Sequence, residues 1–280
     1  MRLSSLSLLI FALAVSPAFT AAPPDVMTLV GQMKEVFEPT GSRIQKVTIS
    51  MRTPTGDEVQ WVAGQARKQV GGGKRTLLVM LEPQHLRGTV LLIGERRGQP
   101  DIMWTYSPVL RRVRALVPVE SYQRFLDTDF TYADLGFVSR QGAYRLLGEE
   151  EYQGTRAYKV ELVPEEQWYY SRIITWIAAD SLLPLRRDFY DRAGRLWKSE
   201  FFEEVATIDG KPTPLRVRMH DVRQDTVTEL RVSDVRTDVE LPDELFDPDQ
   251  LPEVIGSPLW QDYSPQVATG AQPPSEGGRP

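Results

Sequence analysis

The hydrophobic pattern of the chain changes from helical to strand-like near residue 43. Over residues 25–37, apolar side chains recur every three or four positions, with Asp25 placed to cap the first turn and Pro39 beyond the end. From residue 43 onward apolar and polar positions alternate, as they do in half-buried strands. The pattern therefore predicts one amphipathic helix followed by a β domain.

Strand-like runs continue to residue 235 and are separated by turn signals such as Gln153-Gly154, Ala193-Gly194 and Asp209-Gly210. They cover residues 47–51, 59–63, 77–81, 89–93, 102–106, 112–116, 143–147, 157–163, 170–178, 185–190, 196–204, 215–222 and 226–235. Such closely spaced runs indicate a continuous antiparallel meander. We expect a fold that is mainly β with α: a curled antiparallel sheet, an incomplete barrel of about eleven strands, covered by short helices.

Nine apolar or aromatic side chains are predicted to share one face of this sheet, because side chains alternate between the two faces of a strand. Polar positions such as Lys159 and Glu161 indicate that the other face meets water. The nine predicted lipid-binding residues are Trp61, Leu77, Val79, Leu81, Trp104, Tyr106, Tyr158, Val160 and Leu162. They either line a cavity for cargo or fill an ordinary core, and the pattern leaves both possibilities open.

Residues 118–142 interrupt the alternation and contain too many aromatic side chains for a solvated loop. We expect one or two short helices across the mouth of the sheet, and we call residues 122–135 the lid. Its inward-facing residues are predicted to be Phe125, Phe130, Tyr132 and Leu135. Its carboxylates, which need water or helix N-termini, are Asp127, Asp129 and Asp134. The lid is either a gate that moves when cargo enters or a permanent plug.

Both ends of the chain differ from the predicted β domain, which covers residues 23–255. Residues 1–22 contain Arg2, an apolar run of about thirteen residues and small residues at their end, which is typical of a signal peptide and too short to span a bilayer. Residues 256–280 are rich in Pro, Gly and Ser, which predicts a disordered tail where only Trp260 and Tyr263 could dock. We therefore expect export to the periplasm.

The composition of the 280-residue chain argues against several classes of binding site and active site. It has 33 Lys and Arg against 38 Asp and Glu, so there is no basic excess for nucleic acid. It has no cysteine and only two histidines, His85 and His220, which leaves almost nothing for a thiolate, a zinc site or a histidine-based triad. We expect that the protein is not an enzyme and that it binds neither a metal ion nor a cofactor.

The remaining candidates for a catalytic, metal or lipid-binding site are clusters of charged residues. The glutamate runs 149–151 and 165–166 lie beside predicted turns, where solvated charge is commoner than an acid/base pair. Asp127 and Asp129 have the spacing that begins a calcium loop, but the next oxygen ligand and the glycine are missing. Arginines on the predicted strands suit bidentate contacts, so some of them at the rim of an apolar groove would suit an anionic lipid head group.

Several segments carry a resemblance to a known family. They are Gly88-Thr89, Met103 to Pro108, Arg111 to Arg114 and Asp129 to Leu135. With the exported N-terminus and the strand pattern, residues 25–250 resemble the outer-membrane lipoprotein-sorting protein family, in the larger periplasmic branch of the LolA/LolB-like superfamily. The resemblance implies an incomplete antiparallel barrel closed by helices, a hydrophobic cavity for acyl chains and association with a transporter of the resistance-nodulation-division type.

The physical chemistry of lipids agrees with that implication. Each buried methylene is worth about 0.8 kcal/mol, so an acyl chain of about sixteen carbons forfeits on the order of 12 kcal/mol when it crosses water uncovered. We therefore expect a periplasmic carrier or chaperone for lipid or for the acyl chains of lipoproteins, working with an envelope membrane transporter. The alternative is a non-catalytic scaffold that docks in an envelope complex through the sheet edge or the aromatic segment.

Overall fold

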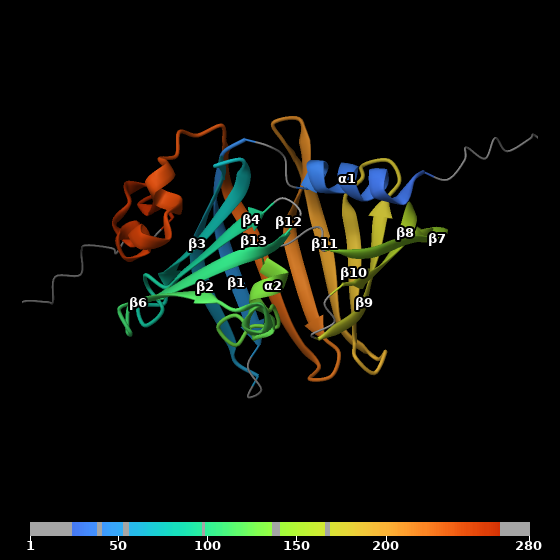
Figure 1. Ribbon diagram of the computed structural model, residues 1–280, viewed down its shortest axis with the longest axis horizontal. Helices are drawn as coiled ribbons and strands as arrows, with labels where there is room; N and C mark the ends of the chain where they lie inside the picture. The colour runs from blue at the N-terminus through green and yellow to red at the C-terminus, as the bar shows by residue number, and fades with distance from the viewer. Residues whose placement is uncertain are drawn as a thin grey trace, which may run out of the picture.

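A single antiparallel sheet dominates the computed structural model, which describes residues 24–37, 41–52, 56–96, 99–135, 141–165 and 169–263. Its thirteen strands follow the order β6-β5-β4-β3-β2-β1-β13-β12-β11-β10-β9-β8-β7 (Figure 1). They are β1 (Arg43–Arg52), β2 (Glu58–Val70), β3 (Gly73–Glu82), β4 (Val90–Arg96), β5 (Gln99–Ser107), β6 (Arg112–Leu116), β7 (Gly142–Tyr152), β8 (Thr155–Pro164), β9 (Tyr170–Ala178), β10 (Pro184–Asp191), β11 (Leu196–Ile208), β12 (Lys211–Asp221) and β13 (Thr226–Thr237). The predicted curled and open antiparallel sheet is confirmed, with two strands more than the estimate of eleven.

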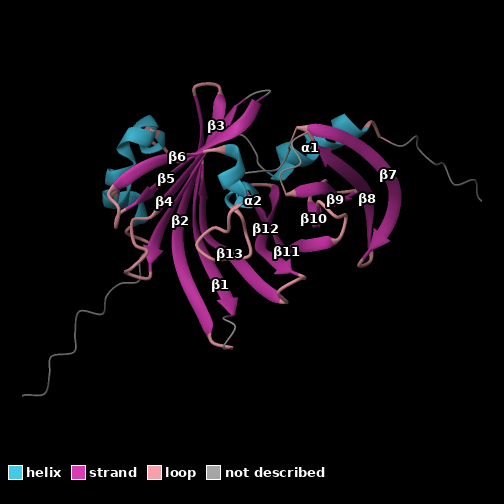
Figure 2. Cartoon of the chain, turned by 60° about the horizontal axis from the view of Figure 1, so that its bottom comes forward, coloured by secondary structure: helices cyan, strands magenta, loops and turns pink. Residues whose placement is uncertain are grey.

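The chain builds this sheet as two arms that meet in its centre. Strands β1 to β6 run outward to one edge, and β7 to β13 run from the opposite edge back to the centre, where β13 pairs with β1. The connection from β6 to β7 must therefore pass from one edge of the sheet to the other. It contains the 3-10 helix η1 (Pro118–Tyr122) and the short helix α2 (Tyr132–Leu135), which lie over the hollow side of the sheet (Figure 2).

The predicted N-terminal helix is α1 (Val26–Phe37). Asp25 caps it, because Oδ2 of Asp25 accepts a hydrogen bond from the backbone nitrogen of Thr28 at 2.9 Å. That bond lowers the pKa of the Asp25 carboxyl. The buried face of the helix packs against Val160 and Ile177 of the second arm, and its buried residues are Leu29, Val30 and Met33. The helix therefore covers the concave face of that arm.

The C-terminal part of the chain, residues 241–263, forms a strap on the outer face of the first arm (Figure 1). It contains the 3-10 helices η2 (Asp243–Phe246), η3 (Pro248–Gly256) and η4 (Pro258–Trp260). Trp260 and Tyr263 are buried, so residues 256–263 of the predicted tail belong to the domain. The predicted signal peptide and residues 264–280 lie outside the described residues.

The strap covers the outer surface of the first arm. That surface was expected to face water, so the expectation is corrected here. Gly64 of β2 makes room for the strap, since a Cβ atom there would lie 2.3 Å from the Trp260 ring. Beneath the strap, the outer face of β3 and β4 is fully buried, and Leu77 and Leu92 are 0% exposed. Both faces of this arm therefore carry apolar side chains, whereas the prediction assigned water to one of them.

Candidate functional site

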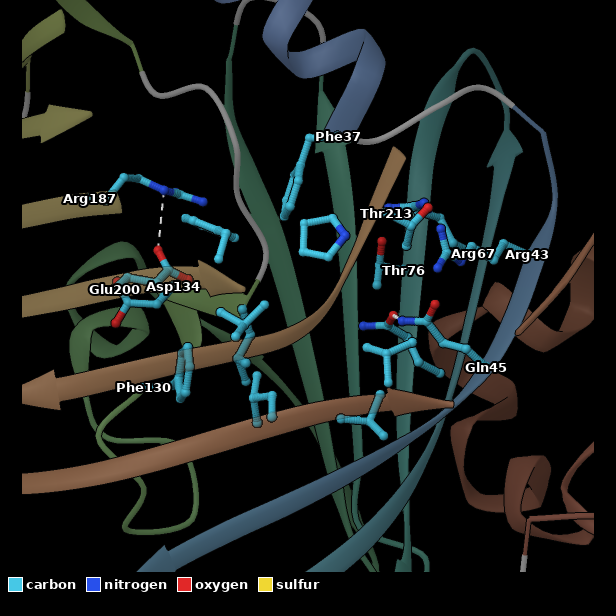
Figure 3. Close-up of a pocket in the computed structure, with 18 residues that line it drawn as sticks. Phe37, Arg43, Gln45, Arg67, Thr76, Phe130, Asp134, Arg187, Glu200 and Thr213 are labelled. Carbon is cyan, nitrogen blue, oxygen red and sulfur yellow. Dashed lines mark hydrogen bonds and ion pairs between the residues drawn. The ribbon is translucent and has the colours of Figure 1, made fainter. Parts of the chain in front are cut away.

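A cavity of about 140 Å³ lies at the centre of the concave face, between the sheet, the end of α1 and the lid (Figure 3). Strands from both arms form its walls. The lid contributes Phe130 and Leu135, and α1 contributes Phe37, whose ring meets Phe202 edge to face at 5.2 Å. The remaining apolar wall consists of Val47, Pro214, Val217, Leu230 and Val232. We call this the central cavity.

Two smaller cavities extend the central cavity along the concave face. One of about 30 Å³ shares Val47, Leu135 and Leu230 with it and continues toward Leu91 and Ile93. The other, of about 20 Å³, shares Arg187 with it and continues beneath α1; its walls include Val160, Leu162 and Ile177. The three cavities thus form a row with mostly apolar walls, from the first arm to the second.

The nine predicted lipid-binding residues do not share one face. Trp61 packs in the concave cluster of the first arm, and Tyr158, Val160 and Leu162 lie in the concave clusters of the second arm. The other five lie on the outer face with the strap: Leu77, Val79, Leu81, Trp104 and Tyr106. Only Val160 and Leu162 line one of the three cavities. Contact of any of the nine with lipid stays a prediction.

The pattern of β3 explains why the concave residues of the first arm were missed. Leu77 to Leu81 is apolar at every position, so the alternation has no phase there. The structure turns Leu78 and Met80 toward the concave side, where they pack with Leu91 and Ile93. The weak sequence signal for this arrangement is the uninterrupted apolar run itself, which is typical of a strand buried on both faces.

The four predicted inward-facing lid residues do contact the sheet. Phe125 is 3% exposed and packs against the concave cluster of the first arm. Phe130 is 1% exposed and packs with residues of the second arm while lining the central cavity. Tyr132 meets Phe125 edge to face at 5.4 Å, and Leu135 lines two cavities. The lid therefore bridges the two arms.

Two of the three lid carboxylates, Asp129 and Asp134, are buried. This corrects the expectation for Asp129, whereas Asp134 lies in the first turn of α2, the second environment that we expected. Asp129 accepts hydrogen bonds from the hydroxyls of Thr226 and Thr228 at 2.6 and 2.8 Å. Its own backbone nitrogen donates to Thr228 Oγ1 at 2.9 Å. The β13 hydroxyls thus replace the water that the carboxylate loses on burial. Asp127 is exposed, as expected.

Asp134 is the second buried carboxylate of the lid. Its Oδ2 atom lies 2.5 Å from the Lys198 ammonium of β11, and its Oδ1 atom accepts a hydrogen bond from the Tyr170 hydroxyl at 3.1 Å. The Lys198 ammonium also lies 5.3 Å from the ring centre of Tyr170. Asp134 therefore ties α2 to β9 and β11 of the second arm.

The polar part of the central cavity has two ends (Figure 3). At one end Arg187 and Glu200 form a buried ion pair at 3.2 Å. At the other end lie Arg43 and Arg67. Burial lowers the pKa of Arg67 to about 10. Burial together with repulsion from Arg67 lowers the pKa of Arg43 to about 10. The second end is thus lined by two partly buried arginines, and burial disfavours their charged form.

The remaining acidic and histidine candidates have ordinary surroundings. Glu150 accepts hydrogen bonds from the Trp176 indole and the Lys159 ammonium, and the indole bond is the main cause of its lowered pKa. His220 lies 3.1 Å from Asp225 at the surface. Among the described residues no group of acidic or histidine side chains could hold a metal ion. In the same part of the chain, none of the helices has the length and apolar composition needed to cross a membrane.

The fold and part of the sequence are shared with known proteins. A family model described as an uncharacterized protein matches residues 72–253. A DUF1329 family protein from Desulfovibrio piger is 28% identical, with a TM-score of 0.74 over 80% of this chain and 96% of that chain. No curated protein matches the chain.

Two further solved structures share the fold. An outer membrane lipoprotein-sorting protein domain from Vibrio parahaemolyticus is 23% identical, with a TM-score of 0.76 over 81% of this chain and 97% of that chain. A LolA superfamily protein from Nitrosomonas europaea is 23% identical, with a TM-score of 0.66 over 81% of this chain and 99% of that chain.

Proposed function

Because the chain belongs to the LolA-like family of outer-membrane lipoprotein-sorting proteins, we propose that it carries lipid or lipidated cargo on the concave face of its sheet. The cargo site is the row of three cavities, and the acyl chain lies between the sheet on one side and α1 and the lid on the other. We assign Trp61, Tyr158, Val160 and Leu162 to this site, because they pack in the clusters of this face.

The row of cavities is the observation that carries the proposal. A core that only stabilises the fold is packed to crystal-like density, with few voids larger than a water molecule. Here three voids follow one face and share Val47, Leu135, Leu230 and Arg187 between neighbouring walls. Small movements of these shared side chains would join the voids into one channel across both arms.

The size of the central cavity implies that the lid moves when cargo enters. Its volume of about 140 Å³ is close to that of an engineered apolar cavity that binds benzene, and below the roughly 300–1,000 Å³ of small-molecule sites. A long acyl chain therefore requires that Phe130 and Leu135 leave the sheet. The lid acts in this proposal as a gate, and the structure has it in the closed position.

The proposal also includes the compartment, the cargo and the partner of the carrier. It works in the periplasm, takes acyl chains of lipids or lipoproteins, performs no catalysis and exchanges cargo with a membrane transporter of the resistance-nodulation-division type. The periplasmic setting is supported by the sorting function named for the neighbour from Vibrio parahaemolyticus. The transporter is proposed from the family resemblance of the sequence.

A scaffold or interaction module is the second candidate, and one surface feature favours it. The hairpin between β5 and β6 ends in Val109 and Leu110, which are 80% and 73% exposed. Strand β6 is also an edge strand, so its free backbone groups could pair with another chain. A scaffold would bind its partner through this edge and would leave the cavities empty.

Lipid extraction and dye binding separate the two candidates. The full chain, purified from the envelope, is extracted and its lipids are identified by mass spectrometry. The stripped protein is then titrated with the neutral dye N-phenylnaphthylamine and with phospholipid. The carrier proposal expects co-purified lipid and a dye Kd that is roughly micromolar or better, with displacement by phospholipid. A folded protein that shows neither would favour the scaffold.

A matched pair of valine substitutions locates the site. Val232→Phe places a ring in the central cavity, whereas Val205→Phe adds the same ring at a position that is 52% exposed. We expect the first change to weaken dye binding by at least about tenfold and the second to leave it unchanged. Equal effects of both changes would place the dye elsewhere and contradict the cavity as the site.

A further inference from the structure

Two glutamine side chains lie opposite each other in the wall of the central cavity. Gln45 of β1 pairs with Gln65 of β2 across the strands, and both line the cavity. The amide nitrogen of Gln45 donates a hydrogen bond to Gln65 Oε1 at 2.5 Å. Gln45 is 8% exposed, and its own buried Oε1 atom has no hydrogen-bond partner in the described part of the chain. Gln45 therefore presents a buried acceptor that lacks a donor.

Other buried acceptors beneath the lid receive their donors from the protein itself. Asp129 accepts hydrogen bonds from the hydroxyls of Thr226 and Thr228, and Asp134 contacts the Lys198 ammonium. Gln45 Oε1 differs from these atoms because its side chain lines a cavity, where a ligand can supply the donor. Burial of a polar atom without a partner is unfavourable, so a ligand that brings a donor gains affinity there.

The glutamine pair lies where the central cavity meets the smaller cavity of the first arm. Gln65 and Thr76 line both cavities, and Figure 3 shows the Gln45 amide turned toward Thr76. Beyond this point the smaller cavity has apolar walls that include Leu91 and Ile93. In the other direction the apolar wall of the central cavity continues to Val217. A polar group bound at Gln45 would therefore have space for an apolar chain on each side.

The chemistry of the acceptor limits the group that can meet it. An ionised carboxylate and an ester carry no hydrogen-bond donor, whereas a hydroxyl and an amide N–H each carry one. An ammonium group also donates, but Arg43 and Arg67 line the same cavity and would repel it. The group that matches Gln45 is therefore a neutral donor.

We propose that Gln45 binds a neutral O–H or N–H donor in the polar linker of the cargo, with acyl chains that extend from it into the cavities on both sides. Gln65 holds the Gln45 amide through their mutual hydrogen bond. Thr76 adds a hydroxyl beside the amide pair, which can meet the acceptor of the same linker. The inference rests on the proposed function, because acyl chains must enter the row of cavities to bring the donor to Gln45.

Displacement of N-phenylnaphthylamine by matched ligands with and without a donor tests the site on the lipid-free full chain. The alcohol dipentylcarbinol is compared with dipentyl ketone, and the amide N-pentylhexanamide with the ester pentyl hexanoate. Within each pair the apolar chains are the same, and only the first ligand carries a donor. We expect the donor ligand to displace the dye at a concentration at least about tenfold lower, because a site with an unpaired polar atom rejects the analogue that lacks its partner.

The two pairs also distinguish the sources of the donor. A preference for the alcohol alone would assign a cargo with a free hydroxyl between its chains. A preference for the amide alone would assign a cargo with an amide-linked chain. Either preference supports the donor site.

Two methionine variants identify the residue responsible. Gln45→Met keeps the length of the side chain and removes the amide acceptor, so the ratio of the two ligands in each pair should fall to about one. Gln60→Met is the matched control, because Gln60 is exposed on the same strand and contacts only Ser50 at 3.5 Å among the described residues. It should keep the preference. If Gln45→Met fails to fold, the ratio measured on the unmodified protein still decides.

Equal displacement within both pairs, or a preference for the ketone and the ester, overturns the donor site but leaves the carrier function standing. Water or a neighbouring protein group would then meet the Gln45 oxygen. An unchanged preference in Gln45→Met overturns the assignment to Gln45. Failure of every ligand to displace the dye, or of the dye to bind, overturns the proposed function itself. The two proposals therefore fail in distinguishable ways.

Discussion

Lys198 Nζ lies 2.5 Å from Asp134 Oδ2, and the two side chains are 1% and 0% exposed. One residue belongs to β11 and the other to the lid, so a fully buried ion pair joins the moving element of the proposed gate to the sheet. Removing one partner of such a pair leaves an uncompensated buried charge, which typically costs 3–5 kcal/mol. Opening the lid must therefore separate these two charges or carry water to them.

We expect Lys198→Met to lower the free energy of unfolding by about 3–5 kcal/mol, because Asp134 then remains buried without its cation. Adding Asp134→Asn should restore part of the loss, since the amide is neutral and can still accept the Thr131 backbone hydrogen bond. Urea unfolding gives both values. The control is Lys159→Met, which breaks a partly exposed pair with Glu150 and should cost about 1 kcal/mol or less. Equal losses would mean that Lys198 does not hold the lid.

Phe130→Ala tests whether the lid is a gate or a plug. Phe130 is 1% exposed, so its removal should cost about 3–5 kcal/mol in the empty protein. If Phe130 contacts the sheet only in the closed form, the variant also shifts the population toward the open form and binds dye more tightly. Phe189→Ala, in the same cluster but on β10, should cost as much without tighter binding. Equal affinities of the two variants would indicate a plug.

Hydrogen exchange measures the same movement without a substitution. Among the described residues, the backbone–backbone hydrogen bonds of the lid close within the lid and the preceding η1, as does the one from the Phe125 nitrogen to the Phe130 carbonyl at 2.8 Å. We expect amides of residues 122–135 to exchange faster than those of β1 and β13, and faster still when lipid is bound. Protection equal to that of the central strands, unchanged by lipid, would rule out the gate.

Gly64→Ala tests the seating of the strap. Its new Cβ atom would meet the Trp260 ring, and overpacking of this kind costs about 1–3 kcal/mol. We expect lower stability in urea together with a shift of tryptophan fluorescence, because the Trp260 ring must move. Gly31→Ala is the control, since nothing lies within 4 Å of that position in α1. It should be neutral or stabilising by up to about 1 kcal/mol.

The strands and α1 could be predicted because their signals are local. The shared face of Tyr158, Val160 and Leu162 and the capping of α1 by Asp25 are each readable within one element, and the structure has both. Glu161 is a correction, because it was expected to face water and is buried. The phase of the alternation, which decides the face of the sheet to which each side chain points, is not always readable within one element. Where β3 is apolar at every position, only the strap, about 160 or more residues later in the chain, decides which side chains face the cavity.

The polar part of the site could not be predicted for a related reason. Asp129 has a local ion-pair partner in Arg124 at 2.7 Å, but Thr226 and Thr228, which also bind it, lie far away in the sequence. The partner of Asp134, Lys198, is equally distant. A carboxylate near an aromatic segment gives no local sign of such a partner, so water was the natural expectation. Arg43 and Arg67 were missed as a pair because only the register of β1 and β2 brings them opposite each other.

The seam between β1 and β13 has a consequence for folding. Each arm consists of hairpins between neighbouring segments, whereas the seam pairs Arg43 with Thr237, near the two ends of the described chain. Local hairpins form quickly, and contacts between distant residues form slowly because a long loop must close first. The concave face cannot exist until the seam has formed, since the central cavity draws its walls from both sides of it. We therefore expect the hairpins of each arm to form first, and the binding surface to be created in the later step that joins the two arms.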